Sequence, residues 1–181
     1  MFSATRIFVA FLLKPLASTA AELSLSSPDV AAGATIGGKY VYNGYGCKGG
    51  NVSPALEWKN PPVGTKSFAL SVFDPDAPTG HGWLHWLVVN IPAATHALPR
   101  NAGSADNKNL PAGSLQIKTD FGAPGYGGPC PPKGHGVHHY VFTLSALGVE
   151  KLELPADAAK ANAQIEAQHL GQASFTAIYQ R

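Results

Sequence analysis

The chain has 181 residues, of which 45% are apolar and 13% charged, and its formal net charge is +2. This length suits one hydrophobic core, and the composition is too apolar and too weakly charged for a disordered chain. The sequence has no basic tract that could neutralise a run of phosphates, which argues against nucleic-acid binding. The 20 glycines and 15 prolines separate short apolar runs, a distribution typical of turns in an all-β protein.

Residues 1–21 have the order of a secretory signal peptide: a basic residue, an apolar run over 7–13, and small residues before Glu22. We therefore predict a cleaved signal over 1–21 and one domain over 22–181, located in the periplasm or secreted. A lysine and a proline keep the apolar run short, so an uncleaved N-terminus and a cytoplasmic location are the alternative. No stretch is apolar over the roughly 18 residues that a transmembrane span needs.

Two cysteines, Cys47 and Cys130, are an even count, and the predicted export signal would deliver the chain to a compartment where disulfides persist. A bridge between them would close a long loop and stabilise the fold by about 4 to 5 kcal/mol on a chain-entropy estimate. Two separate buried thiols are the alternative. The spacing matches no zinc-ligand pattern.

Several segments alternate or run apolar over strand lengths and are bounded by Gly, Pro, Asn and Asp. These predicted strands lie at 39–42, 55–59, 67–74, 83–91, 114–119, 138–147 and 174–179. Seven short strands predict a sandwich or a barrel. One helix is predicted late, at 156–170, because an Ala- and Gln-rich segment lies between a proline and a glycine.

The alternation of side chains along two strands turns a carboxylate and an imidazole toward the core. Asp74 ends the apolar row of the strand at 67–74. His85 lies near the start of the next strand, and strict alternation places it on the face of Leu87 and Val89. Both polar side chains are therefore predicted to point inward.

The strand at 138–147 adds a second imidazole. His138 shares its face with Tyr140 and is predicted to point inward, whereas His139 points away. If the strand that ends at Asp74 returns antiparallel, its end lies beside the start of the strand that carries His85. We therefore expect one carboxylate and two imidazoles to meet at one end of a sheet.

Such a cluster suits an anion, because Asp74 would orient an imidazole whose other nitrogen donates to a phosphate or carboxylate oxygen. The alternative is structural: the three groups only satisfy one another, since an unpaired buried polar group costs about 1 to 3 kcal/mol. Asp76 is interpreted as the cap of the turn at 74–78, because aspartates bond nearby backbone amides. The Gly- and Pro-rich loop at 125–134 is stiff and lets backbone approach a ligand closely.

Two motifs resemble those of the phosphatidylethanolamine-binding proteins, in their bacterial Raf kinase inhibitor-like branch. The first comprises DPDAP at 74–78 and GWLHWLVVNIP at 82–92, and the second is YGGPCPPKGHGVHHY at 126–140. The triplet DFG at 120–122 and the tetrapeptide NVSP at 51–54 also fit, and the resemblance extends from about residue 23 to 179.

This resemblance implies a sandwich of two antiparallel sheets with a small cavity that accepts phosphate, phosphoryl headgroups or small carboxylates. It implies neither an enzyme nor a cofactor. The implied ligand-binding residues are Asp74, Pro78, His85, Pro132, His138 and Tyr140, with Asp76 and Trp86 beside them.

At two places the sequence departs from the family pattern, and each departure changes which family properties are expected of this chain. His139 stands where many relatives carry arginine, which makes a cationic contact there dependent on pH. The sequence after the last predicted strand also lacks the additional helix of animal relatives, so inhibition of a Raf-type kinase does not transfer.

Three functions are therefore weighed. The first is a binding protein for a small anion or a phospholipid headgroup. The second is an inhibitor that contacts a protease or kinase through surface loops. The third is a metal-dependent hydrolase, because five of the seven histidines lie near the predicted cavity and could ligate zinc. No Gly-x-Ser-x-Gly nucleophile motif occurs. The five histidines are His81, His85, His135, His138 and His139.

Overall fold

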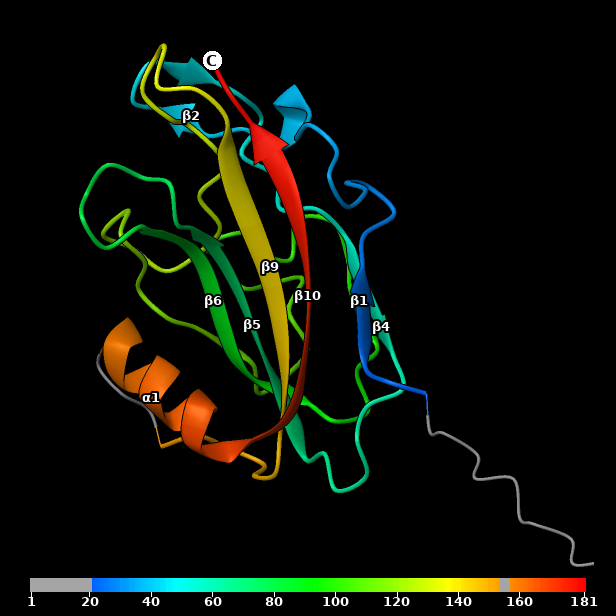
Figure 1. Ribbon diagram of the computed structural model, residues 1–181. Coiled ribbons are helices and arrows are strands. Elements are labelled where there is room, and N and C mark those ends of the chain that lie inside the picture. Colours follow the sequence, from blue (N-terminus) through cyan, green and yellow to red (C-terminus); the bar gives the residue numbers. More distant parts are fainter. Residues whose placement is uncertain (1–20, 154–156) are drawn as a thin grey trace, which may run out of the picture.

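The computed structural model describes residues 21–153 and 157–181 (Figure 1). The predicted signal segment, apart from residue 21, lies outside the described residues. Within the described part, no helix is long and apolar enough to span a bilayer. The elements are β1 Ser24–Ser26, a 3-10 helix Gly38–Tyr40, β2 Asn43–Gly44, β3 Cys47–Lys48, β4 Leu56–Lys59, β5 Ser67–Asp74, β6 Trp83–Pro92, β7 Ala97–Leu98, β8 Leu115–Gln116, β9 His138–Leu147, α1 Ala158–Gln168 and β10 His169–Tyr179.

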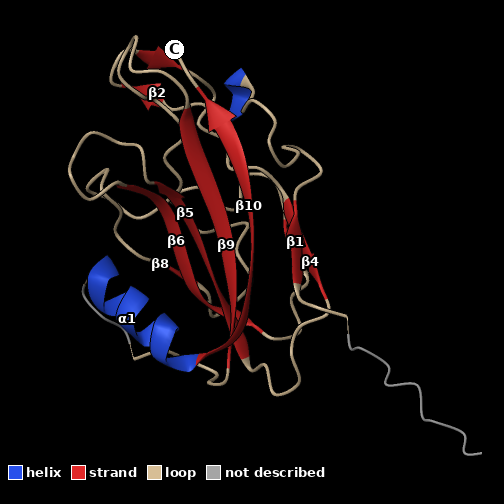
Figure 2. Cartoon of the chain, in the orientation of Figure 1, coloured by secondary structure: helices blue, strands red, loops and turns tan. Residues whose placement is uncertain are grey.

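Two antiparallel sheets face each other across the main core (Figure 2). The larger sheet has the strand order β10-β9-β5-β6-β8, and the smaller has the order β1-β4-β7. Large apolar side chains of both sheets interdigitate between them, among them Trp58 from the small sheet and Phe68, Phe142 and Leu144 from the large one. The predicted β-sandwich with one late helix is confirmed.

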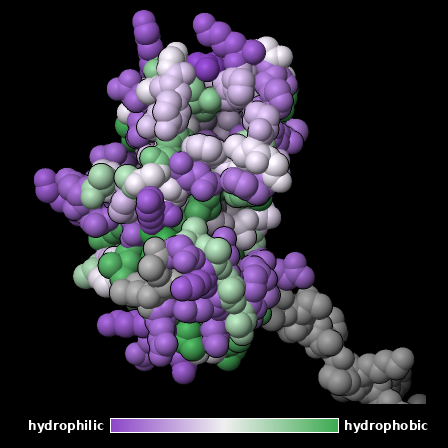
Figure 3. All heavy atoms as spheres, turned by 90° about the vertical axis from the view of Figure 1, so that its left-hand side faces the viewer, coloured by the Kyte–Doolittle hydropathy of each residue, from purple (hydrophilic) through white to green (hydrophobic). Residues whose placement is uncertain are grey.

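A second, smaller core lies on the other face of the large sheet, where α1 covers part of that face (Figure 1). Ala161 and Ile165 of α1 pack there against Leu87 and Val89 of β6. The side of the molecule that carries α1 is mostly hydrophilic, with smaller hydrophobic areas between the polar side chains (Figure 3). The helix thus completes a third layer and presents its polar face outward.

The longer predicted strands are confirmed, and the short ones are less accurate. β5 and β9 have the predicted bounds, and β4 and β6 differ by one residue. The predicted strand at 39–42 is wrong, because the amides of Tyr40 and Val41 bond to carbonyls three residues earlier and close a 3-10 turn. Of the predicted strand at 114–119, only β8 joins the sheet.

The late helix is confirmed but is shorter than the predicted 156–170. Asp157 caps its N-terminus by accepting a hydrogen bond from the amide of Lys160 at 2.8 Å. At the other end, His169 has extended backbone angles and begins β10 at once. β10 is therefore longer than the predicted strand at 174–179.

The outer edge of β10 is covered by the segment 33–36. The amides of Gly33 and Ile36 donate to the carbonyls of Thr176 and Ile178 at 2.7 and 2.8 Å, and the amide of Ile178 donates to the carbonyl of Ala34 at 3.0 Å. This part of β10 therefore has hydrogen-bonding partners on both sides.

Candidate ligand-binding site

A cavity of about 200 Å³ opens at the end of the large sheet where β5 ends and β6 and β9 begin. It contains six of the residues that the sequence assigned to ligand binding: Asp74, Pro78, His85, Pro132, His138 and Tyr140. The remaining lining residues are Tyr45, Ala77, Thr79, Trp83, Phe121, Cys130 and Pro131. The sheet topology thus brings together side chains that lie far apart in the sequence.

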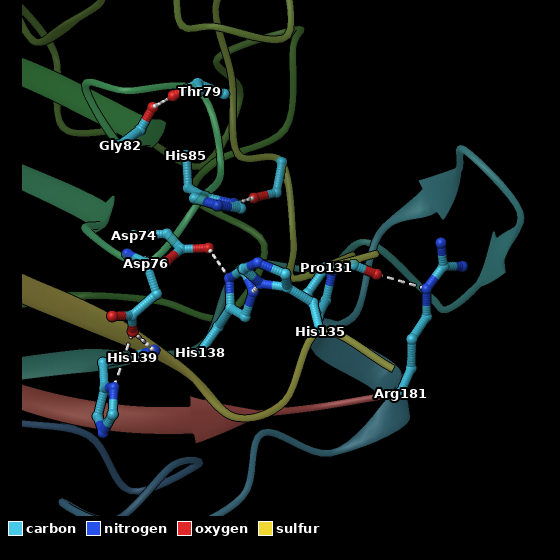
Figure 4. Close-up of polar contacts among 11 residues, drawn as sticks. Asp74, Asp76, Thr79, Gly82, His85, Pro131, His135, His138, His139 and Arg181 are labelled. Atoms are coloured by element: carbon cyan, nitrogen blue, oxygen red, sulfur yellow. Dashed lines mark hydrogen bonds and ion pairs between the residues drawn. The ribbon is translucent and has the colours of Figure 1, made fainter. Parts of the chain in front are cut away.

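Asp74 and His138 form a buried pair on neighbouring strands (Figure 4). His138 Nδ1 lies 2.7 Å from Asp74 Oδ2, and the two residues are 1% and 3% exposed. His138 Nε2 lies 2.8 Å from Nδ1 of His135, so both ring nitrogens of His138 have protein partners. The predicted convergence of the carboxylate with this imidazole agrees with the structure.

His85 enters the cavity through a β-bulge. β5 pairs Val72 with Trp86 and Phe73 with Leu84, so His85 is an extra residue of β6 without a partner on β5. A bulge re-aims the side chain of the extra residue and is frequent beside functional sites. Here it directs the imidazole into the cavity.

The same bulge corrects the alternation predicted for β6. His85 was expected on the face of Leu87 and Val89, but these two side chains pack under α1 on the opposite face of the sheet. Strict alternation gives the right direction for His85 and the wrong neighbours, because the extra residue reverses the parity of the positions after it, as far as a second register shift between Val88 and Ile91.

The environment of His85 keeps its ring neutral. Burial, with the ring packed at 5.4 Å from Phe121 and 5.0 Å from Tyr140, lowers the pKa of His85 from 6.5 to about 4. His85 Nδ1 lies 2.7 Å from the carbonyl oxygen of Gly127 and donates to it, because a carbonyl only accepts. The Nε2 of the neutral ring then carries a lone pair. It is an acceptor rather than the expected donor.

This low pKa predicts a dependence of stability on pH. Below about pH 6.5 the unfolded chain protonates His85, whereas the folded chain does so only near pH 4. The free energy of unfolding is therefore not reduced by this protonation above about pH 6.5. It decreases as the pH falls toward 4, by up to about 1.4 kcal/mol per pH unit. Urea unfolding of the native protein and of His85→Gln across this range should show the steeper loss in the native protein. If the free energy of unfolding fell equally with pH in both proteins, the low pKa of His85 would be contradicted.

Asp76 does not cap the turn, contrary to the interpretation from sequence. The capping carboxylate is that of Asp74, whose Oδ1 accepts from the amide of Asp76 at 2.9 Å. Asp76 Oδ2 instead accepts from both the amide and Nδ1 of His139 on β9, each at 2.8 Å (Figure 4). Burial alone would raise the pKa of Asp76, but the hydrogen bonds from His139 outweigh it and hold the pKa below its ordinary value.

Trp86, expected beside the cavity, lies in the main core and does not line it. Its side chain is fully buried, its indole nitrogen donates to Gln116 at 2.6 Å, and its ring packs edge-on against Tyr126. The residue follows the bulge and pairs with Val72, so it points between the two sheets and away from the cavity.

An aromatic rim was missed from the sequence. Tyr45, Trp83 and Phe121 line the mouth of the cavity, and the ring centroids of Trp83 and Phe121 lie 5.5 Å apart. Trp83 has the alternation of a lining residue, and Phe121 lies in the DFG triplet, so both carried a signal. Tyr45 carried none, because the hairpin that holds it is attached to the cavity wall by contacts distant in sequence, among them a cross-link.

That cross-link is the disulfide between Cys47 and Cys130, which is present as predicted. It joins the hairpin of β2 and β3 to the Pro-rich wall. Arg181 adds a second tie, since its Nε donates to the carbonyl of Pro131 at 2.5 Å (Figure 4). The amide of Gly134 in turn donates to the carbonyl of Arg181 at 3.0 Å. The wall of the cavity is thus attached to two other parts of the chain.

Histidine and aspartate are also metal ligands. Within residues 21–153 and 157–181, however, no group of three or more His, Cys, Asp or Glu side chains is placed to hold a metal ion together.

Comparison with known proteins identifies the family. The profile of the family described as "Phosphatidylethanolamine-binding protein" matches residues 26–180. The chain belongs to the phosphatidylethanolamine-binding protein family. Among members of this family, the UPF0098 protein YbcL of Escherichia coli (strain K12) is 45% identical over 163 residues, which cover 89% of each chain. The UPF0098 protein YbhB of the same organism is 44% identical over 159 residues, which cover 87% of this chain and 99% of YbhB.

Solved structures of the phosphatidylethanolamine-binding protein family have the same fold. The crystal structure of Escherichia coli YbcL superposes with a TM-score of 0.86 and covers 89% of this chain and 99% of YbcL. The phosphatidylethanolamine-binding protein homolog CT736 of Chlamydia trachomatis, 26% identical, gives a TM-score of 0.73 and covers 88% and 98% of the two chains. The predicted membership in the bacterial part of this family is confirmed.

Proposed function

We propose that this protein is a non-enzymatic binding protein whose cavity holds a small phosphoryl or carboxyl group, free or as the head of a larger molecule. The observation that carries the proposal is the convergence of Asp74, His85, His138 and Tyr140 in one cavity of about 200 Å³. The volume suits one phosphoryl group with a short substituent. Membership in the phosphatidylethanolamine-binding protein family supports the same class of ligand.

The hydroxyl of Tyr140 is the strongest sign that the cavity expects a ligand. Tyr140 is 1% exposed and lines the cavity, and among the described residues its hydroxyl has no partner at hydrogen-bond distance. Burial and the nearby Asp74 carboxylate raise the pKa of this hydroxyl, so it keeps its hydrogen. Such a group costs about 1 to 3 kcal/mol when it stays unpaired, so it is usually satisfied by a protein group, an ordered water or a ligand. A phosphate or carboxylate oxygen would accept its hydrogen.

The aromatic and proline side chains at the mouth support a ligand with an attached apolar part. Tyr45 is 65% exposed at the rim, and Pro131 and Pro132 add a rigid stretch of the cavity wall. A polar end and an apolar mouth are typical of sites that fix the head of a ligand and tolerate variation in its substituent.

Titration with inorganic phosphate, followed by calorimetry and by NMR of the histidine side chains, tests this function. We expect His85→Ala and Tyr140→Phe each to weaken binding at least about tenfold, the effect of losing one hydrogen bond of about 1.4 kcal/mol. The matched control is His96→Ala, since His96 is exposed and does not line the cavity. The control should bind phosphate like the native protein. Equal affinity in all four proteins would contradict the proposed site.

A further inference from the structure

The hydrogen-bond roles inside the cavity restrict the ligand more than its volume does. His85 Nδ1 is committed to the carbonyl of Gly127 at 2.7 Å, which leaves the neutral ring with an acceptor at Nε2. Asp74 is also an acceptor, with one oxygen bonded to His138 and the other to the amide of Asp76. Two buried acceptors therefore line a cavity in which an anion is expected.

The second histidine contributes no hydrogen to the cavity in its neutral form. Its Nδ1 donates to Asp74, so its Nε2 accepts from Nδ1 of His135 at 2.8 Å. The remaining donor among these groups is the hydroxyl of Tyr140, which is buried near Asp74 and has no partner at hydrogen-bond distance among the described residues. The cavity thus combines one free donor with acceptors on Asp74 and His85.

The charges around His85 have the same sign. Asp74 and Asp120 are the charged groups that act on its ring, and Tyr140 and Phe121 pack against it. In the described part of the chain, no lysine or arginine lines the cavity. A fully deprotonated oxyanion would place its lone pairs against those of His85 and Asp74. A ligand oxygen that carries a hydrogen would meet them as a donor.

We propose that the cavity selects phosphoryl groups that retain one P–O–H, namely phosphomonoesters and inorganic phosphate in their protonated form, over phosphodiesters and sulfates. This inference rests on the proposed function and names the ligand class of the same site. The P–O–H donates to His85 Nε2, and an unprotonated oxygen of the same group accepts from the hydroxyl of Tyr140. A phosphodiester or a sulfate ester has no such hydrogen at neutral pH, so a lone pair of His85 would face a lone pair of the ligand.

Phenyl phosphate and phenyl sulfate form a matched pair of probes. At about pH 5 each carries one negative charge, because the second pKa of a phosphate monoester is about 6, and the two differ chiefly by one hydrogen. Calorimetric titration of the native protein at this pH should give phenyl phosphate at least about a tenfold higher affinity. At about pH 8 the phosphate loses its hydrogen, and the ratio of the two affinities should fall toward one. Phenyl sulfate does not titrate in this range, so it reports any change in the protein itself.

Two variants separate the roles of the groups. His85→Gln should lower the ratio of affinities at about pH 5, because the amide offers a donor as well as an acceptor. Tyr140→Phe should weaken both probes and leave the ratio unchanged, since its hydroxyl meets an oxygen that both ligands possess. Thermal unfolding confirms that each variant is folded, and the comparison of pH values in the native protein requires no variant.

The outcomes are distinguishable. Two results would overturn this inference and leave the proposed function standing. One is equal affinity for both probes at about pH 5, and the other is tighter binding of phenyl phosphate at about pH 8 than at about pH 5. If the native protein binds neither probe nor inorganic phosphate, the proposed function fails and the inference fails with it.

Discussion

Replacing both cysteines, as Cys47→Ser with Cys130→Ser, should lower the free energy of unfolding by about 4 kcal/mol. The disulfide joins residues 83 positions apart, and a loop of that length removes much of the conformational entropy of the unfolded chain. The change is expected as a shift of the urea midpoint, with spectroscopic signals of the native sandwich retained in water.

Reductant provides the control for the disulfide. It should destabilise the native protein by a similar amount and leave the double variant unaffected. The affinity for phosphate should also fall on reduction, because the bridge attaches the hairpin that carries Tyr45 to the wall formed by Pro131 and Pro132. The same urea midpoint for the oxidised native protein and the double variant would show that the disulfide does not contribute to stability.

Trp86→Ala is the single core substitution with the largest expected effect, a loss of about 3 to 5 kcal/mol in the free energy of unfolding. The side chain is fully buried between the sheets, and its removal leaves a large cavity. It also leaves Gln116 without the hydrogen bond at 2.6 Å that joins β8 to this part of the core.

The matched control is Trp83→Ala, three residues earlier on β6, where the side chain is only partly buried at the cavity mouth. Its expected loss of stability is about 1 kcal/mol. Trp86→Phe should bind phosphate within about twofold of the native protein, because the ring does not line the cavity. A stability loss for Trp86→Ala no greater than that for Trp83→Ala would contradict this placement.

Much of the fold could be predicted because the central strands are long and their apolar pattern is strong. β5 and β9 are interior strands of the large sheet, so their long apolar or alternating runs mark their bounds in the sequence. β1, β7 and β8 are two or three residues long, and so short a segment shows no period. The segment at 39–42 alternates like a strand, but its first residues form a 3-10 turn, and local hydrogen bonding of this kind leaves no mark in the alternation.

The site was predictable where regular geometry applies. Asp74, His138 and Tyr140 follow strict alternation along β5 and β9, and the structure places them together. The bulge at His85 could not be read from the sequence, because it is a mismatch in the pairing of two strands. The direction of the hydrogen bonds was equally hidden, since the acceptor role of His85 Nε2 depends on a carbonyl 42 positions away.

The covering of β10 by the segment 33–36 affects how copies of this protein behave toward one another. Unpaired peptide groups at the rim of a sheet are a template on which a second chain can add a strand and begin to aggregate. Here the amide and carbonyl groups near Thr176 and Ile178 are already bonded within the chain, and β8 at the opposite rim has only two residues. The sheet that carries Asp74, His85 and His138 is therefore protected, along these stretches, against polymerisation with itself.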